Sequence, residues 1–226
     1  MKIPVEYYED EMHDVVDNAV KSMGRKARIT KDQTAINKWI LGQSTETTSD
    51  GTAVFSNTHT VLDGSTLDNL ETGTLTPSNL ETLVRSLRKQ KDNKGDLGGH
   101  DAYGLLASLN LYEDALEITQ SELKPGGAQN DANIHNTMFS KVYPAMEVVG
   151  TSPFIHSDYS SATNVNTMYF VASRNHSLKR FVRVAMDTWI RDYKDDDKLR
   201  YTYGGRYREV TSWIDPFGAV ASSGTV

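Results

Sequence analysis

The fold is decided by a stretch that opens with Thr76-Pro77-Ser78-Asn79-Leu80-Glu81 and continues to Ser121. Thr76 can cap the free backbone N–H groups of a helix, and Pro77 suits the first helical position. Apolar residues then recur at helical spacing, at Leu80, Leu83, Val84 and Leu87. The pattern predicts an amphipathic helix, which Gly95 is placed to end.

A predicted strand and a second predicted helix complete this stretch. Residues 103–109 have the apolar composition of a buried strand. Asn110, with Glu113 three residues later, resembles a cap before a helix with an apolar face. That face consists of Leu111, Ala115, Leu116 and Ile118. Helix, strand and helix form the centre of an α/β layer, and nothing in this stretch resembles a reaction centre.

Composition and charge narrow the class of protein. The chain has 226 residues, which is enough for one large domain or two small ones. Its hydrophobic content of 38% and charged content of 24% are typical of a soluble globular protein. The net charge of −6 does not suggest nonspecific binding to nucleic acid. Because cysteine is absent, disulfides, thiolate catalysis and thiolate metal sites are excluded.

No targeting or membrane segment is expected. No apolar run approaches the ~20 residues that span a bilayer. The first eight residues are followed by acidic residues rather than by an apolar core, so they do not form a signal peptide.

Residues 9–27 form a predicted helix, because apolar side chains recur there at steps of three or four. The stripe consists of Met12, Val16, Ala19, Met23 and Ala27, widened by Val15 and Val20. Acidic residues lie in its first half and basic residues in its second, which matches the helix dipole. Thr30 and Gln33 then resemble a capping box before a new stripe with Trp39 and Ile40. The pattern leaves open one kinked helix or two helices.

Loops and short strands are predicted around the central stretch. Residues 52–55 predict a short strand, and residues 56–73 predict a polar, turn-rich loop. A second long loop is predicted over residues 124–133. Residues 146–150 predict a strand that Pro153 closes.

From Thr167 onward the apolar period changes to that of strands. Separate runs predict strands over residues 168–172 and 178–186, a third containing Trp189 and Ile190, and a long polar strand over residues 200–214. Consecutive strands with short turns favour antiparallel pairing. We expect this β-rich tail to pack with the first helix, which gives an α+β fold with the middle of the chain as an insertion.

The first candidate site is acidic. Asp10, His13, Asp14 and Asp17 are three or four residues apart, so they can share a helix face and hold a divalent metal. A solvated helix start, favoured by the dipole, is the stronger interpretation, because no second matching cluster occurs elsewhere.

Two loop segments offer weaker candidates. Ser56 and His59 are close enough to suggest nucleophilic catalysis, but no Gly-x-Ser-x-Gly elbow is present. A loop histidine with local hydrogen bonds is the stronger interpretation. Gly98-Gly99-His100-Asp101 could admit a phosphate, but it lacks the P-loop lysine and the dinucleotide spacing. A flexible turn is favoured there.

Three further features have plain interpretations. Residues 192–198 resemble an epitope tag with one Asp missing and are interpreted as a native charged turn. Asn175-His176-Ser177 is a formal glycosylation sequon, which matters only in a secreted protein. The aromatic residues of the last long strand could stack on bases, but packing against another subunit is favoured because its arginines are balanced by nearby acids. The aromatic residues are Tyr201, Tyr203, Tyr207 and Trp213, and the arginines are Arg200, Arg206 and Arg208. The sequence therefore predicts no catalytic residue, no cofactor and no metal.

The order of several motifs resembles that of a known family. Asp50-Gly51-Thr52-Ala53-Val54-Phe55-Ser56-Asn57-Thr58-His59 resembles the DG-x-x-LF-x-x-x-H segment of tailed-phage major capsid proteins, in particular the Mu-like major head subunit group. In that group a Gly-rich loop ending in Asn-Leu follows, as at Asn69-Leu70. A helix similar to residues 80–92 comes next.

The resemblance extends over nearly the whole chain. A strand leads into a helix like residues 111–121 and then into a Pro-Gly…Asn-Asp…Asn loop like residues 125–133. A long strand like residues 201–213 is followed by an Asp-x-x-Gly turn, here residues 215–218. Residues 3–10 resemble the entry to that family's spine helix.

The resemblance implies a shell-forming structural protein without catalysis. Residues 1–73 and 165–226 would form most of a peripheral (P) domain with a spine helix, and residues 74–164 an axial (A) domain. The subunit would self-assemble, through pentamers and hexamers, into an icosahedral head around double-stranded DNA. Scaffold, portal and decoration proteins would be its partners, in the virion and, during assembly, in the host cytoplasm. Neither sequence-specific nucleic-acid binding nor membrane association is implied.

The chain departs from the family pattern in three ways. An N-terminal arm and an extended E-loop should precede the spine helix, and this sequence begins at that helix. We therefore expect it to be mainly monomeric or weakly associated by itself. The strand at residues 103–109 lacks a proline before the next helix, and the loop at residues 56–73 is polar throughout.

Two alternatives stay open at this point. A metal-dependent hydrolase would use Asp10, His13 and Asp14 together with His59 or His100. An encapsulin-like compartment shell protein would share the capsid fold and differ in what it encloses.

Overall fold

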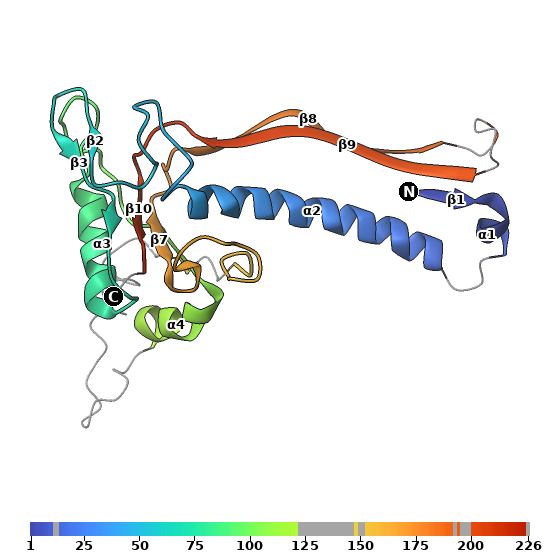
Figure 1. Cartoon of the computed structure of the whole chain (residues 1–226), viewed down its shortest axis with the longest axis horizontal. Helices are drawn as coiled ribbons and strands as arrows, with labels where there is room; N and C mark the ends of the chain where they lie inside the picture. The colour runs from blue at the N-terminus through green and yellow to red at the C-terminus, as the bar shows by residue number, and fades with distance from the viewer. Residues whose placement is uncertain (11–13, 122–146, 149–151, 192–193, 195–199, 225–226) are drawn as a thin grey trace. The chain divides into compact units, whose positions relative to one another are not determined.

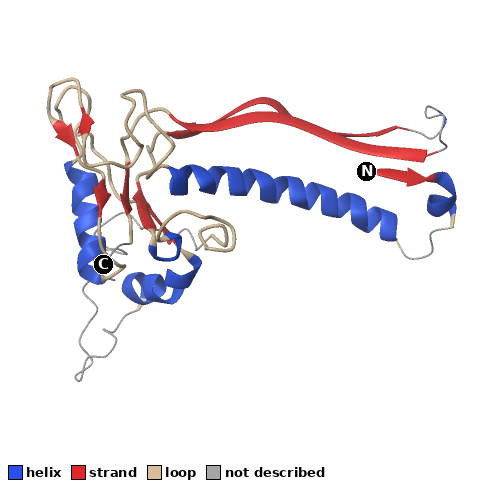
Figure 2. Cartoon of the chain, viewed as in Figure 1, coloured by secondary structure: helices blue, strands red, loops and turns tan. Residues whose placement is uncertain are grey.

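The computed structural model describes residues 1–10, 14–121, 147–148, 152–191, 194 and 200–224 (Figures 1 and 2). Helices and strands are both present, so the predicted α+β class is confirmed. The chain divides into two compact units. Unit 1 comprises residues 1–35 and 180–212, and unit 2 comprises residues 36–179 and 213–226. The predicted boundaries of peripheral and axial domains, after residues 73 and 164, stay a prediction.

Unit 2 is built on a mixed five-stranded sheet with the order β4-β10-β7-β5-β6. The three central strands, β10, β7 and β5, pair antiparallel, whereas the outer strands β4 and β6 run parallel to their neighbours. The strands are β4 (Leu70–Glu71), β5 (Gly104–Ala107), β6 (Glu147–Val148), β7 (Tyr169–Ala172) and β10 (Ala219–Ser222). Residues 103–109, 146–150 and 168–172 were thus correctly predicted to contain strands.

Two helices cover one face of this sheet: α3 (Pro77–Lys89) and α4 (Tyr112–Gln120). The four apolar residues of α3 are buried together with Ala115 and Ile118 of α4. On the sheet they meet alternate residues, such as Tyr169 and Val171 of β7 and Val220 of β10. The helix–strand–helix layer is therefore confirmed, and its apolar period matches the face that it buries.

The ends of these helices agree only in part with the predicted signals. Thr76 caps α3, because its hydroxyl accepts a hydrogen bond from the Asn79 N–H at 3.2 Å. The helix ends at Lys89, however, and the prediction that Gly95 ends it is wrong. Gly95 instead lies in a following turn with φ of +85°. The predicted Asn110 cap is also wrong, since Ser108 caps a 3₁₀ turn (Leu109–Leu111) that precedes α4.

The other face of the sheet carries an aromatic core. Phe170 of β7 alternates with Tyr169 and Val171, so it points to this face. Its neighbours come from the end of helix α2 (Val15–Leu41), from the segment before strand β2 (His59–Thr60) and from the end of strand β9 (Arg200–Trp213). They include Trp39, Ile40, Val54, Phe55 and Trp213.

The polar loop contains more structure than predicted. β2 (His59–Thr60) and β3 (Thr66–Leu67) pair antiparallel within it. The predicted strand at residues 52–55 is wrong, because that segment makes only a single bridge between Thr47 and Ala53. Val54 and Phe55 are wholly buried, so their apolar character serves the core rather than a sheet.

Unit 1 combines a helix with a three-stranded sheet. Helix α2 (Val15–Leu41) continues without a break through residues 28–31 into unit 2, so the predicted capping box is wrong. The hydroxyls of Thr30 and Thr34 instead donate to the carbonyls four residues earlier, at 3.0 and 2.8 Å. Its 27 residues give a length of about 40 Å. A short helix, α1 (Val5–Glu9), precedes it.

The sheet of unit 1 has the order β1-β9-β8. β1 (Lys2–Pro4) pairs antiparallel with β9 (Arg200–Trp213), and β8 (Leu178–Arg191) flanks β9. Two separate strands were predicted within β8, which is wrong. A parallel connection between β8 and β9 would have to run back along the full length of a 14-residue strand. The eight residues between the two strands span at most about 28 Å, which is too short for this, so the pair is antiparallel.

The predicted packing of the tail on the first helix is confirmed within unit 1. Val20 and Met23 of α2 contact Ile3 of β1 and Tyr201 and Tyr203 of β9. α2 runs alongside β8 and β9 in this unit (Figure 1). Among the described residues, no helix is both long and apolar enough to cross a bilayer.

We predict that Gly218→Ala destabilises unit 2 by about 2–3 kcal/mol, because it adds a steric clash to backbone strain. Gly218 has φ of +79°, and a Cβ there would lie 2.9 Å from the Cα of His176. Gly51→Ala is the matched control, since Gly51 has the same φ but open space around it. It should lose only about 1 kcal/mol in urea unfolding. Equal losses would contradict the role assigned to the contact.

Candidate functional site

The segment from Asp50 to His59 folds around a buried histidine. His59 is only 1% exposed, and its Nδ1 lies 2.7 Å from Asp50 Oδ2. Its Nε2 lies 3.0 Å from the carbonyl oxygen of Val54. Both ring nitrogens therefore face oxygen acceptors, so neither is available as a base for a nucleophile.

Asp50 is held by several donors as well as by the histidine. Burial raises the pKa of its carboxyl, but hydrogen bonds from Thr48, His59 and Thr52 outweigh this and lower the pKa to about 2. The Thr48 hydroxyl donates to Oδ1 at 2.6 Å, and the Thr52 N–H donates to the same oxygen at 3.0 Å. Gly51, with its positive φ, allows the tight turn that brings these donors together.

We predict that Asp50→Asn lowers the free energy of unfolding by about 2 kcal/mol at pH 7, because charge-assisted hydrogen bonds are lost. The folded pKa of about 2 lies below the ordinary 3.8, so the contribution is full above about pH 4 and is lost as pH falls toward 2. Urea unfolding across this range measures the difference. Asp101→Asn, which removes an exposed ion pair with Arg88, should change stability by less than about 0.5 kcal/mol. A difference independent of pH would contradict the assignment.

Asn69 joins three separate segments of unit 2 in the same region. Its side-chain oxygen accepts the Ser56 N–H at 2.7 Å, and its Nδ2 donates to the carbonyls of Val54 and Pro216 at 2.8 and 3.0 Å. The residue is wholly buried. The motif from Asp50 to Asn69 therefore fixes a loop onto the core, a role that the sequence did not reveal for Asn69.

Ser56 and His59, the candidates weighed for nucleophilic catalysis, bond to other groups rather than to each other. Ser56 Oγ lies 2.9 Å from the Thr58 hydroxyl and accepts the Thr58 N–H, rather than facing His59. Asp10, Asp14 and Asp17 belong to unit 1, and His13 lies outside the described residues. The described part of the chain contains no group of three or more His, Asp or Glu placed to hold a metal.

Residues 98–101 are irregular and form neither a turn nor a phosphate loop, so the turn favoured there is wrong. Gly98 N–H donates to the Gln90 carbonyl at 2.9 Å, and the His100 ring folds back over Gly98. Burial lowers the pKa of His100, which Asp215 partly opposes. His100 and two acidic residues, Asp92 and Asp215, line one open pocket in this region.

The remaining sequence features are structural or lie outside the described residues. The charged turn at residues 192–198 is described only at Lys194. In the sequon, the rings of His176 and Trp39 meet edge to face at 5.7 Å, and Ser177 donates to the Asp215 carbonyl. Burial and the nearby Lys179 lower the pKa of His176.

Base stacking by the last long strand is excluded for its most buried aromatic residues. Tyr203 lies against α2, and Trp213 belongs to the core of unit 2. Tyr207 carries the Lys31 ammonium over its ring at 4.7 Å, and Lys31 also pairs with Glu209 at 3.3 Å. These odd-numbered residues of β9 therefore face the helix.

The opposite face of this sheet is exposed although it carries large apolar residues. Phe181, Trp189 and Val210 are exposed there, together with arginines. Phe181 and Trp189 were predicted to lie in apolar strand runs, but this exposed surface was not predicted. The available signal was Arg183, which lies two residues after Phe181 and therefore on the same face of the strand.

Comparison with known proteins gives a family and a fold. A family described as phage capsid protein matches residues 7–222. Among solved structures, the chain is similar to a phage-related protein from Bordetella bronchiseptica RB50, with a TM-score of 0.53 and 10% identity, over 99% of this chain and 74% of that chain. At this identity the likeness shows the fold alone. No curated protein matches the chain.

Proposed function

Because this chain belongs to the phage capsid protein family, we propose that it is the major subunit of an icosahedral phage head that encloses double-stranded DNA. The family match over residues 7–222 carries this proposal, since it covers nearly the whole chain. The buried polar groups of the Asp50–Asn69 motif are engaged in hydrogen bonds within the fold. This supports the proposal, because these groups then hold the structure together rather than act on a substrate. We propose no catalysis.

The proposed architecture is that of a Mu-like major head subunit. α2 would be the spine helix, and residues 1–73 and 165–226 would form most of the peripheral domain. Residues 74–164 would form the axial domain. The packing of α2 on the β-rich tail within unit 1 supports this, because a stiff helix-on-sheet plate suits a repeated building block.

The subunit would work through repeated weak contacts. Each interface can be modest, because many copies held in one shell act together. Its main partners would be other copies, in pentamers and hexamers, with scaffold, portal and decoration proteins alongside. It would lie in the virion and, during assembly, in the host cytoplasm.

Electron microscopy and mass spectrometry of particles test the proposal. The chain is produced together with the other head proteins encoded beside it, and particles are separated on a density gradient. We expect closed shells of uniform diameter in which this chain is the most abundant protein. Shells that form equally well when its gene is deleted would contradict the proposal.

A further inference from the structure

The outer face of the unit 1 sheet can be defined by strand alternation. Odd-numbered residues of β9 face α2, as Tyr203, Tyr207 and Glu209 show, so even-numbered residues point away. A Cβ on Gly204 would lie 2.4 Å from the Trp189 ring, which places Trp189 on the same outward side. By alternation, Phe181 and Arg183 of β8 lie there too. We name this surface the hairpin face: Phe181, Arg183 and Trp189 with Arg206, Arg208 and Val210.

The hairpin face has the composition of a protein interface. Trp189 is 43% exposed and Val210 is 58% exposed, which leaves apolar area in water. Tryptophan, phenylalanine and arginine are the residue types enriched at the centres of interfaces. A partner with apolar and acidic groups would cover both parts of this surface.

Charge argues against two hairpin faces pairing with each other. If two hairpin faces met, the arginines of one copy would face the same arginines of the other: Arg183, Arg206 and Arg208. Asp187 of β8 is the acidic residue on this face. Like charges brought together at an interface cost several kcal/mol. The partner surface must therefore differ from the hairpin face, which makes the contact heterologous.

Unit 2 of a second copy supplies the complementary charge. It contains 10 basic and 17 acidic residues, a net charge of −7, whereas unit 1 contains 14 basic and 13 acidic residues, a net charge of +1. Unit 2 exposes apolar side chains at several places, including Leu62, Leu97, Tyr159 and Ile214. We choose helix α4 with the turn before it, because exposed apolar residues are accompanied there by acidic but no basic residues. Leu109 and Tyr112 are about half exposed and adjoin the exposed Glu113 and Asp114, and no basic residue lies in the helix.

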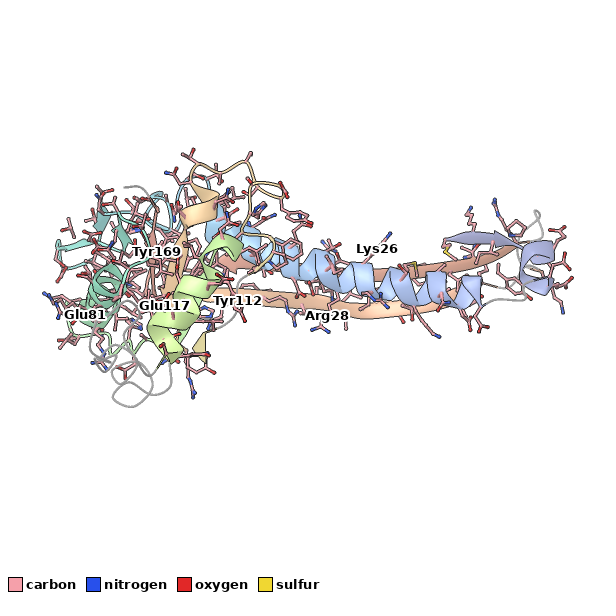
Figure 3. All side chains as sticks on the ribbon, turned by 90° about the horizontal axis from the view of Figure 1, so that it is seen from below. Lys26, Arg28, Glu81, Tyr112, Glu117 and Tyr169 are labelled. Carbon is pink, nitrogen blue, oxygen red and sulfur yellow. The ribbon has the colours of Figure 1, made fainter. Side chains whose placement is uncertain are left out.

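Figure 3 shows Tyr112 and Glu117 along α4. We name the surface formed by Leu109, Tyr112, Glu113 and Asp114 the α4 face.

We propose that the hairpin face of one copy docks on the α4 face of a second copy. The apolar residues would meet at the centre, and arginines would pair with Glu113 and Asp114 around them. Because the two surfaces differ, each copy can bind two neighbours, so the contact propagates into a ring or an open array. The inference rests on the proposed self-assembly and names one contact through which it proceeds.

Site-directed cross-linking tests the contact, because the chain has no cysteine of its own. Two differently tagged chains, Val210→Cys and Tyr112→Cys, are mixed and treated with a short bismaleimide. We expect mixed cross-linked dimers at least about tenfold above a Val210→Cys and Leu62→Cys control, because docking holds only the first pair close. Leu62 suits the control, since it lies in unit 2 and is 85% exposed. Equal cross-linking of both pairs would overturn the proposal.

Charge reversal gives a second, independent measurement. Arg206→Glu with Arg208→Glu should reduce the mixed cross-link about tenfold or more, and Glu113→Lys with Asp114→Lys on the other chain should restore it. Loss without restoration would overturn the pairing of these two surfaces. Arginine-dependent binding of a DNA oligonucleotide, with the cross-link unchanged by charge reversal, would assign the hairpin face to nucleic acid instead.

The outcome separates this inference from the proposed function. Shells that contain this chain but show no Val210–Tyr112 cross-link would refute only the docking contact. Absence of the chain from shells would refute the proposed function, whatever the cross-linking of the purified chain shows.

Discussion

Replacing Trp39 with alanine is expected to lower the free energy of unfolding of unit 2 by about 3–5 kcal/mol, because a large buried ring leaves a cavity that the core cannot fill. Trp39 is 8% exposed and lies at the centre of the aromatic core. Its ring meets those of Trp213, Phe170 and Phe55 at centroid distances of 4.8, 5.6 and 6.0 Å. Removing it therefore breaks several aromatic contacts at once.

Urea unfolding followed by tryptophan fluorescence measures this loss, since Trp213 of the same core still emits, together with Trp189, after Trp39 is removed. Trp189→Ala is the matched control, because Trp189 is an exposed tryptophan of unit 1. Its replacement should change the unfolding free energy of unit 2, reported by Trp39 and Trp213, by less than about 0.5 kcal/mol. A comparable shift in both variants would mean that Trp39 does not hold this core together.

The central helix was predictable because its signals are local. The Thr76 cap, Pro77 and the apolar spacing all act within one helix, and each is observed in α3. Other local signals were overridden by tertiary packing. Thr30 and Gln33 lie inside α2 rather than at a helix start. Met23 before them packs in the apolar cluster of unit 1, Trp39 after them packs in the core of unit 2, and the helix continues between these two positions.

The site was less predictable because it depends on contacts distant in sequence. The Asp50 and His59 pair lies nine residues apart, and a local hydrogen-bonding histidine was correctly favoured there. The bond from Asn69 to Pro216 spans 147 residues, so no local pattern indicates it. The hairpin face was missed for a different reason. Apolar alternation identifies a strand, but it does not say which face remains uncovered.

The second large effect is expected from Asn69→Asp, which should destabilise unit 2 by about 3–5 kcal/mol at pH 7. The change keeps an acceptor for the Ser56 N–H but removes both donors. A buried carboxylate oxygen would then face the carbonyl oxygens of Val54 and Pro216, which now accept from Nδ2 at 2.8 and 3.0 Å. No cation lies among these hydrogen-bond partners to offset the charge.

The pH dependence identifies the cause, because only the ionised form of the new side chain is repelled. Burial beside carbonyls raises the pKa of the new carboxyl above the unfolded value of about 3.9. The loss relative to wild type is therefore smallest below about pH 4, where a protonated carboxyl can donate to one of the two carbonyls, and grows as pH rises. Asn110→Asp, at an exposed position, should show neither the loss nor its pH dependence in parallel urea titrations. A loss of equal size at pH 3 and pH 7 would mean that the substitution destabilises unit 2 through its shape rather than its charge. It would contradict the proposed role of Asn69, which is to hold Val54, Ser56 and Pro216 together by hydrogen bonds.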